Sequence, residues 1–206
     1  MNTKKLIRKI LVYALYIILF TCLQVTYPDL FTYFGQTGDL MLIFVVFVSY
    51  FFGFWDGFTV ALIVGVLRDY FSSPSYISVN GESTSSFGIG MLTMLVISVI
   101  SSSIFSRRVN RKVTFSFLTL LIVSFLYKTV GHIVNFVYIR FFTDLNYGLD
   151  MYDIVISSIL PSVFLNMVFS IPVLLLVRFL GPYSKGINPK LIDEYSVEGD
   201  ELWLKI

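Results

Sequence analysis

The sequence predicts an all-α membrane protein: a polytopic bundle of six transmembrane helices with both termini in the cytoplasm. Of its 206 residues, 56% are apolar and only 14% are charged, whereas a soluble domain is usually about a quarter charged. The apolar segments are continuous rather than alternating at every second residue, which favours helices over a β-barrel. The basic residues form short clusters instead of one broad face, so we expect no nucleic-acid partner.

The first apolar segment, 7–26, is expected to be a retained helix rather than a removed signal peptide. No A-x-A-like cleavage site follows it, and "LFT" before Cys22 lacks the small residue expected before a lipidated bacterial cysteine. Cys22 is the only cysteine in the chain. The sequence therefore predicts no intrachain disulfide and no thiolate metal cluster.

The 33 residues from Asp39 to Phe71 could form one helix or two. One helix of that length would measure about 50 Å, well beyond a hydrocarbon core of about 30 Å. The alternative is two short helices, 39–54 and 57–71, joined by a tight turn at "GFWDG". The later apolar segments are 86–106, 113–139 and 152–180, and Pro161 and Pro172 are expected to kink or interrupt the last one.

The placement of basic residues favours two helices. With six spans, the cluster before the first segment, the "RRVNRK" loop and the cluster around the end of the last segment all fall on one side. With five spans, the "RRVNRK" loop and the N-terminal cluster would lie on opposite sides of the membrane. The positive-inside rule therefore predicts six helices and cytoplasmic termini. The residues concerned are Lys4, Lys5, Arg8, Lys9, Arg107, Arg108, Arg111, Lys112, Arg178, Lys185, Lys190 and Lys205.

The chain reads as one transmembrane domain, 1–181, followed by a cytoplasmic tail, 182–206, that is expected to be mobile. The outward loop 72–85 is polar and rich in turn formers. The tail has two prolines and five acidic residues, a composition typical of a disordered extension or of one that orders on a partner.

Small residues recur every four positions along 57–71, at Gly57, Ala61 and Gly65. Positions four apart share one helix face, so these residues form a groove that permits close approach of another helix. The groove packs either against the protein's own bundle, which we favour, or against a partner.

Asp69 continues this face at the outer end of the helix, and neighbouring Arg68, about 100° away on the helix, could snorkel outward instead of pairing with it. On 113–139, Lys128, His132 and Asn135 share another face. Ionisable groups within a membrane need partners. We therefore expect an intramembrane polar network of Asp69, Arg68, Lys128, His132 and Asn135, in which Asp69 pairs with Lys128 or His132. We favour a structural tie between helices over a proton path or a binding site. Asp56 is expected at the cytoplasmic surface.

Nothing in the sequence points to catalysis. One histidine without a thiolate or carboxylate cluster predicts no metal site. The chain contains no Gly-Lys-Ser/Thr phosphate loop and no G-x-S-x-G motif. We therefore expect no catalytic residues and no cofactor.

The stretch "GDLMLIFVVFVSYFFGFWDGFTVALIVGVLRDYF" resembles the bacterial rod-shape determining protein D family, MreD. The similarity lies in the Asp39-Leu40 start, the glycine-spaced hairpin and the ending Gly65-Val66-Leu67-Arg68-Asp69, followed by "GESTSSFGIG" at the entry to the next helix. The resemblance covers roughly 5–180, and its distinctive part is Asp39–Phe71.

The resemblance implies a non-enzymatic multi-pass scaffold of the bacterial cytoplasmic (inner) membrane. It would belong to the rod complex, or elongasome, and help to control peptidoglycan synthesis and cell shape. Its partner would be MreC and, indirectly, MreB, RodA and its transpeptidase, with membrane lipids around it.

The MreD family is similar in fold to the substrate-binding subunits of energy-coupling-factor transporters, so a vitamin-binding subunit is the alternative. Such a subunit needs an outward cavity with convergent polar and aromatic groups and a small-residue docking surface. In the first segment Ala14 is the only alanine. A membrane enzyme acting on lipid-linked precursors would need more converging charges than Asp69, Lys128, His132 and Arg140.

Overall fold

The computed structural model describes residues 3–33, 35–71, 76–79, 82–84, 88–104, 113–142 and 151–183. The described chain is mostly helical. Three of its helical segments are long and apolar enough to cross a membrane: Leu6–Thr26, Val113–Ile133 and Val155–Phe179. Two shorter apolar helical segments accompany them, Leu40–Phe52 and Gly90–Ser103.

Each of the six predicted apolar segments corresponds to one helical segment of the structure. The last of them is continuous through a short α-helix, a π-helical turn and a longer α-helix. The bounds are α1 Thr3–Thr26, α2 Leu40–Phe52, α3 Phe54–Phe71, α4 Ile89–Ser103, α5 Val113–Phe142, α6 Met151–Ile154, the π turn η2 Val155–Ile159 and α7 Leu160–Phe179.

Two small β-hairpins and a 3₁₀ turn, η1 (Pro28–Phe31), were not predicted. Strand β1 (Thr32–Tyr33) pairs antiparallel with β2 (Gln36–Thr37), and Gly35 between them has a φ of 72°. Strand β3 (Tyr76–Val79) pairs antiparallel with β4 (Glu82–Thr84). The residues separating β3 from β4 are Asn-Gly, the dipeptide that two-residue hairpin loops favour. The segment expected to be only a polar loop therefore contains strands.

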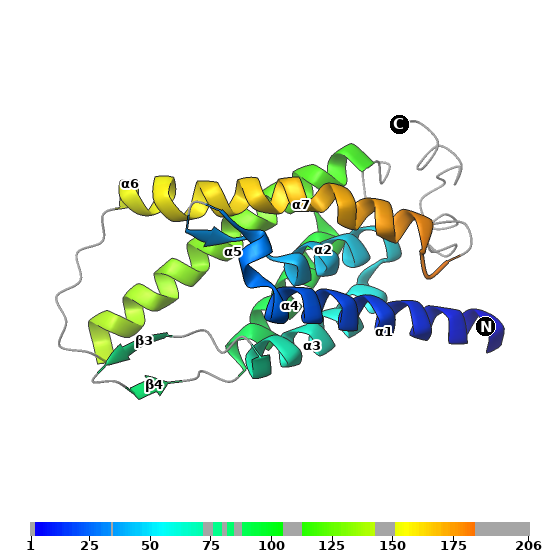
Figure 1. The fold of residues 1–206 in the computed structure, drawn as a ribbon, viewed down its shortest axis with the longest axis horizontal. Coiled ribbons are helices and arrows are strands. Elements are labelled where there is room, and N and C mark those ends of the chain that lie inside the picture. Colours follow the sequence, from blue (N-terminus) through cyan, green and yellow to red (C-terminus); the bar gives the residue numbers. More distant parts are fainter. Residues whose placement is uncertain are drawn as a thin grey trace.

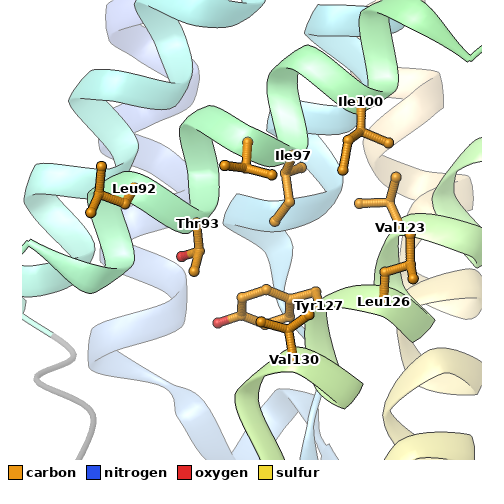
Figure 2. A pocket seen from close by; sticks show the side chains of 9 residues that line it. Leu92, Thr93, Ile97, Ile100, Val123, Leu126, Tyr127 and Val130 are labelled. Atoms are coloured by element: carbon orange, nitrogen blue, oxygen red, sulfur yellow. The ribbon is translucent and has the colours of Figure 1, made fainter. Parts of the chain in front are cut away.

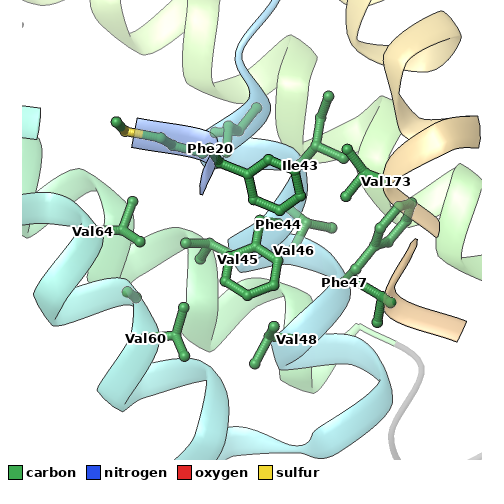
Figure 3. Packing of buried hydrophobic residues seen from close by; sticks show 14 of the residues in the cluster. Phe20, Ile43, Phe44, Val45, Val46, Phe47, Val48, Val60, Val64 and Val173 are labelled. Atoms are coloured by element: carbon green, nitrogen blue, oxygen red, sulfur yellow. The ribbon is translucent and has the colours of Figure 1, made fainter. Parts of the chain in front are cut away.

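Helix α2 is the centre of the bundle. All 13 of its residues are buried, and α1, α3, α4, α5 and α7 all contact it. Figure 3 shows Phe44 and Phe47 of α2 among Phe20 of α1, Val60 of α3 and Val173 of α7. A helix of 13 residues is only about 20 Å long, and its neighbours shelter it on all sides.

The turn between α2 and α3 is shorter than predicted. The only non-helical residue between them is Gly53, whose φ of 91° lies in the region that glycine adopts without a steric penalty. Helix α3 begins directly afterwards at Phe54, so Asp56 belongs to its first turn. The "GFWDG" segment is therefore one turn residue followed by a helix start, rather than a five-residue turn.

The last helical segment is irregular near Pro161, where the sequence predicted a kink or an interruption: it widens into a π-helical turn without breaking. The N–H group of Leu160 donates to the carbonyl of Val155, five residues back, and this widened turn precedes α7. Pro161 then occupies the first turn of α7, where its missing N–H group costs little. Pro172 lies inside α7.

Several predictions concern parts outside the described residues. These are the tail beyond residue 183, the "RRVNRK" loop, most of the loop between α3 and α4, and the side chains of Asn135 and Arg140.

Candidate functional site

The bundle has two polar ends. In Figure 1 the start of α1, the α2–α3 junction and the end of α7 lie together on the right, whereas both hairpins and α6 lie on the left. We call these the Asp56 end and the Asp39 end, after the buried carboxylate at each.

At the Asp56 end, one carboxylate holds three segments together. Asp56 is only 5% exposed and forms an ion pair with Lys9 of α1. It also accepts hydrogen bonds from the hydroxyl groups of Tyr13 (2.8 Å) and Tyr183 (2.6 Å). Asp56 is thus covered by α1 and the segment after α7 instead of being exposed to solvent, and its expected place at the cytoplasmic surface of the membrane stays a prediction.

The aromatic rings complete this cluster. The Lys9 ammonium lies 6.0 Å from the centre of the Tyr13 ring and 5.7 Å from that of Tyr183, within cation–π range. Burial, together with the hydrogen bond to Asp56, raises the pKa of Tyr183 well above its ordinary value. Tyr183 is thus held as a neutral donor, and it fixes the chain leaving α7 against the α2–α3 hairpin.

At the Asp39 end, a second carboxylate caps the central helix. Asp39 accepts a hydrogen bond from the Leu42 N–H (2.9 Å), as an N-cap residue does. Its other oxygen forms an ion pair with Arg68 of α3. The Arg68 guanidinium lies 5.0 Å from the centre of the Tyr127 ring of α5. Arg68 therefore points into the bundle, and the outward orientation considered for it is not observed.

Two amides fix the chain entering α2. Gln24 of α1 donates to the Gly38 carbonyl (2.9 Å) and accepts from the Leu40 N–H (2.8 Å). Asn166 of α7 accepts from the Asp39 N–H (2.7 Å) and donates to Ser124 of α5 (3.2 Å). The start of α2 is thus held directly by α1, α3 and α7, and Ser124 of α5 supports it only through Asn166.

Asp69 binds the start of α4. It accepts hydrogen bonds from the N–H groups of Gly88 (2.9 Å), Gly90 (2.8 Å) and Met91 (3.1 Å). The positive end of a helix dipole stabilises a carboxylate at this position. The "GIG" sequence fits this role: Gly88 has a φ of 102°, and a Cβ on Gly90 would lie 2.2 Å from Asp69 Oδ1.

Residues of the predicted polar network have partners other than those in the two expected pairs, Asp69–Lys128 and Asp69–His132. His132 of α5 forms a hydrogen bond with Ser158 (2.9 Å), whose hydroxyl faces Gln36 of the first hairpin. Lys128 lies one turn before His132 on the same face of α5. Lys128 and His132 thus lie along the seam between α5 and α7, next to the Asp39 cluster.

The small-residue groove packs inside the bundle. A Cβ on Gly57 would lie 2.6 Å from the Ser49 Cα of α2, and one on Gly65 would lie 2.5 Å from the Met91 Cα of α4. Ala61, between them, is fully buried. The groove therefore brings the backbones of α2 and α4 against α3.

A cavity of about 190 Å³ lies between α4 and α5 (Figure 2). Its walls are almost entirely aliphatic, and it is open at the side of the bundle, where Leu92, Val96 and Val130 are exposed. The Tyr127 ring lies across the cavity from Thr93 and Ile97. This cavity was not predicted, since no local sequence pattern indicates how closely α4 and α5 pack.

Sequence reasoning also missed the Asp56 cluster and the pairing of Asp39 with Arg68. A signal existed for Asp39, because an aspartate before an apolar run is a typical N-cap. Comparison of the chain with protein-family models, with curated proteins and with solved structures gives no match.

Proposed function

We propose that this protein is a non-enzymatic scaffold of the bacterial rod complex that crosses the cytoplasmic membrane six times with both termini inside. In this role it binds MreC and, through it, contributes to the control of peptidoglycan synthesis by MreB, RodA and its transpeptidase. The proposal starts from the resemblance to the MreD family in the Asp39–Phe71 hairpin.

One observation supports this role most: the carboxylates of that hairpin are used to hold helices. Asp39 caps α2 and pairs with Arg68, Asp56 binds α1 and the chain after α7, and Asp69 binds the start of α4. Carboxylates tied into such contacts stabilise one arrangement of helices. A rigid bundle with apolar outer faces suits a subunit whose work is to bind and orient another membrane protein.

The six-span placement is supported by the match between predicted segments and helices. The short helix α2 would cross the membrane while sheltered on all sides, and short spans are commonly accommodated by local thinning of the bilayer. The Asp56 end, with Lys9 and the end of α7, would face the cytoplasm.

Depletion of the protein from the cells that encode it tests the proposal. We expect rod-shaped cells to become round and newly made peptidoglycan to lose its pattern along the side wall, both restored by the wild-type gene. Unchanged shape together with a loss of vitamin uptake would contradict the proposal and favour the energy-coupling-factor alternative.

A further inference from the structure

Helix α3 turns its charged side chains into the bundle. Asp56 and Arg68 form ion pairs with other segments. Asp69 accepts hydrogen bonds from the backbone at the start of α4. The side of α3 that faces away from the small-residue groove therefore carries no charge, although α3 is not one of the three segments that qualify as membrane spans by length and composition.

The middle of this outward side is aliphatic. Leu62, Ile63 and Val66 are exposed there. Thr59 is exposed too, but its hydroxyl donates to the Trp55 carbonyl (2.8 Å), so the backbone satisfies it without water. Such a surface is compatible with the hydrocarbon chains of a bilayer, which offer no hydrogen-bond partner.

An exposed pair of aromatic rings lies at each end of the aliphatic stretch. Trp55 is 77% exposed, and its ring contacts that of Phe54 edge to face, with 5.3 Å between the ring centres. Tyr70 is 73% exposed and contacts Phe71 in the same way, at 4.9 Å. Trp and Tyr are enriched at both membrane–water interfaces. The two pairs therefore mark where the two interfaces meet α3.

The two aromatic pairs are closer together than the interfaces of an ordinary bilayer. Trp55 and Tyr70 are 15 residues apart, which corresponds to about 22 Å along the helix. A typical hydrocarbon core is about 30 Å thick. The surface of α3 is thus short of an ordinary core by about 8 Å.

Helix α4, which packs along α3, is equally short. It has 15 residues, or about 22 Å of rise, and its outward side exposes Leu92, Val96 and Val99. We call the exposed surface from Trp55 to Tyr70 on α3 and from Leu92 to Val99 on α4 the α3–α4 face. The short surface is therefore two helices wide.

The last helical segment is much longer. Val155–Phe179 has 25 residues, or about 37 Å of rise. Figure 1 shows α5 and the α6–α7 segment reaching past the end of α3 on the side of the hairpins. Exposed apolar side chains follow the whole last segment in one stripe: Ile156, Leu160, Phe164, Val168, Ile171, Leu175 and Phe179. An ordinary hydrocarbon core fits this part of the surface.

We propose that the α3–α4 face thins the bilayer beside it to a hydrocarbon layer of about 22 Å, whereas the bilayer beside α7 keeps its ordinary thickness. Lipids next to a surface shorter than the hydrocarbon core adapt to the length of that surface. This inference rests on the membrane placement within the proposed function, but not on MreC or the rod complex.

Tryptophan quenching by brominated lipids, with the full chain reconstituted in vesicles, tests the proposal. The only two tryptophans of the chain are first replaced, by Trp55→Phe and Trp203→Phe. Tyr70→Trp on α3 or Phe164→Trp on α7 is then introduced, each at an exposed aromatic position. The two positions are matched, because each lies 15 residues from an exposed aromatic position at the Asp56 end, 55 or 179.

The depth of the two tryptophans should differ in dioleoylphosphatidylcholine. Bromines near the ester end of the acyl chain should quench Tyr70→Trp at least about twofold more strongly than bromines near the methyl end, because the residue lies at an interface. Phe164→Trp should show the reverse order, since exposed apolar residues continue beyond it.

Equal depth profiles for the two variants would overturn the proposal. Quenching of Phe164→Trp alone would also overturn it, because protein rather than lipid would then cover α3. Absence of quenching in both variants would overturn the membrane placement, and this proposal with it. The two kinds of failure are therefore distinguishable.

Lipid selection provides a second measurement with the same variants. The vesicles contain equal amounts of brominated dioleoylphosphatidylcholine and unlabelled dimyristoleoylphosphatidylcholine, whose chains are shorter. The shorter lipid should be enriched about twofold beside Tyr70→Trp and not beside Phe164→Trp, because it fits a thin hydrocarbon layer with less distortion. The same lipid composition beside both tryptophans would overturn the proposal.

Discussion

Asp39, Asp56 and Asp69 have different partners but a common effect, since each fixes a helix start against distant parts of the chain. Their oxygens bind ammonium, guanidinium, phenol or backbone N–H groups. Buried carboxylates of this kind are costly to leave partly paired. The consequences can be tested one residue at a time.

Replacing Asp56 with Asn should lower the free energy of unfolding by about 2 kcal/mol, because Lys9 loses its ion partner and two tyrosine hydroxyls lose a charged acceptor. Thermal unfolding in detergent measures the change. The matched control is Asp29→Asn, at an exposed position of η1. Equal unfolding temperatures for the two variants would contradict this account of the Asp56 end.

Asp69→Asn should also destabilise the protein, by about 1–2 kcal/mol, because an amide N–H₂ would face backbone N–H groups that now donate to a carboxylate. Hydrogen exchange provides the local measurement: amide protection should fall at the start of α4 and remain unchanged at the start of α2. Unchanged protection at Gly90 and Met91 would show that Asp69 does not hold this helix end.

At the scale of the helices, two close contacts determine how α3 packs. Gly57 faces the backbone of α2 and Gly65 faces the backbone of α4. A backbone neighbour cannot rotate away as a side chain can, so an added methyl group must push the helices apart. These sites contrast with Gly131 of α5, which has open space around it.

Gly57→Ala should therefore destabilise the protein by about 2 kcal/mol or more. Gly131→Ala should leave it unchanged or stabilise it by up to about 1 kcal/mol, because alanine is the better helix former. Both variants make the same chemical change within a helix, so unfolding temperatures can be compared directly. A loss in Gly131→Ala as large as that in Gly57→Ala would contradict the packing described.

The helices were more predictable from sequence than their contacts. The small-residue spacing identified the packing face of α3, and the length of Asp39–Phe71 required a break, which the structure places at Gly53. By contrast, the Asp56 cluster joins residues that are far apart in the sequence: Lys9, Asp56 and Tyr183. No local sequence pattern indicates that these residues come into contact. Asp69 was recognised as a polar end of the groove, but its partners belong to the start of α4, whose position depends on the whole bundle.

At the scale of the whole molecule, the two polar ends define the orientation that we propose. Single cysteines can test it in a Cys22→Ser background, because Cys22 is the only native cysteine. Cysteines replacing Asn2 and Asn110 should react with a membrane-impermeant thiol reagent only after the membrane is opened. A cysteine replacing Asn80 should react in intact spheroplasts. Labelling of position 110 in intact spheroplasts would contradict the six-span arrangement.

Co-purification from native membranes tests the central claim, the scaffold function, most directly. The tagged protein is isolated in mild detergent, and its bound proteins and small molecules are identified by mass spectrometry, with a membrane protein of similar size as the control bait. The account predicts a stoichiometric partner with a single transmembrane helix and a periplasmic domain, corresponding to MreC. A bound vitamin or a co-purifying ATPase module, without such a partner, would contradict it.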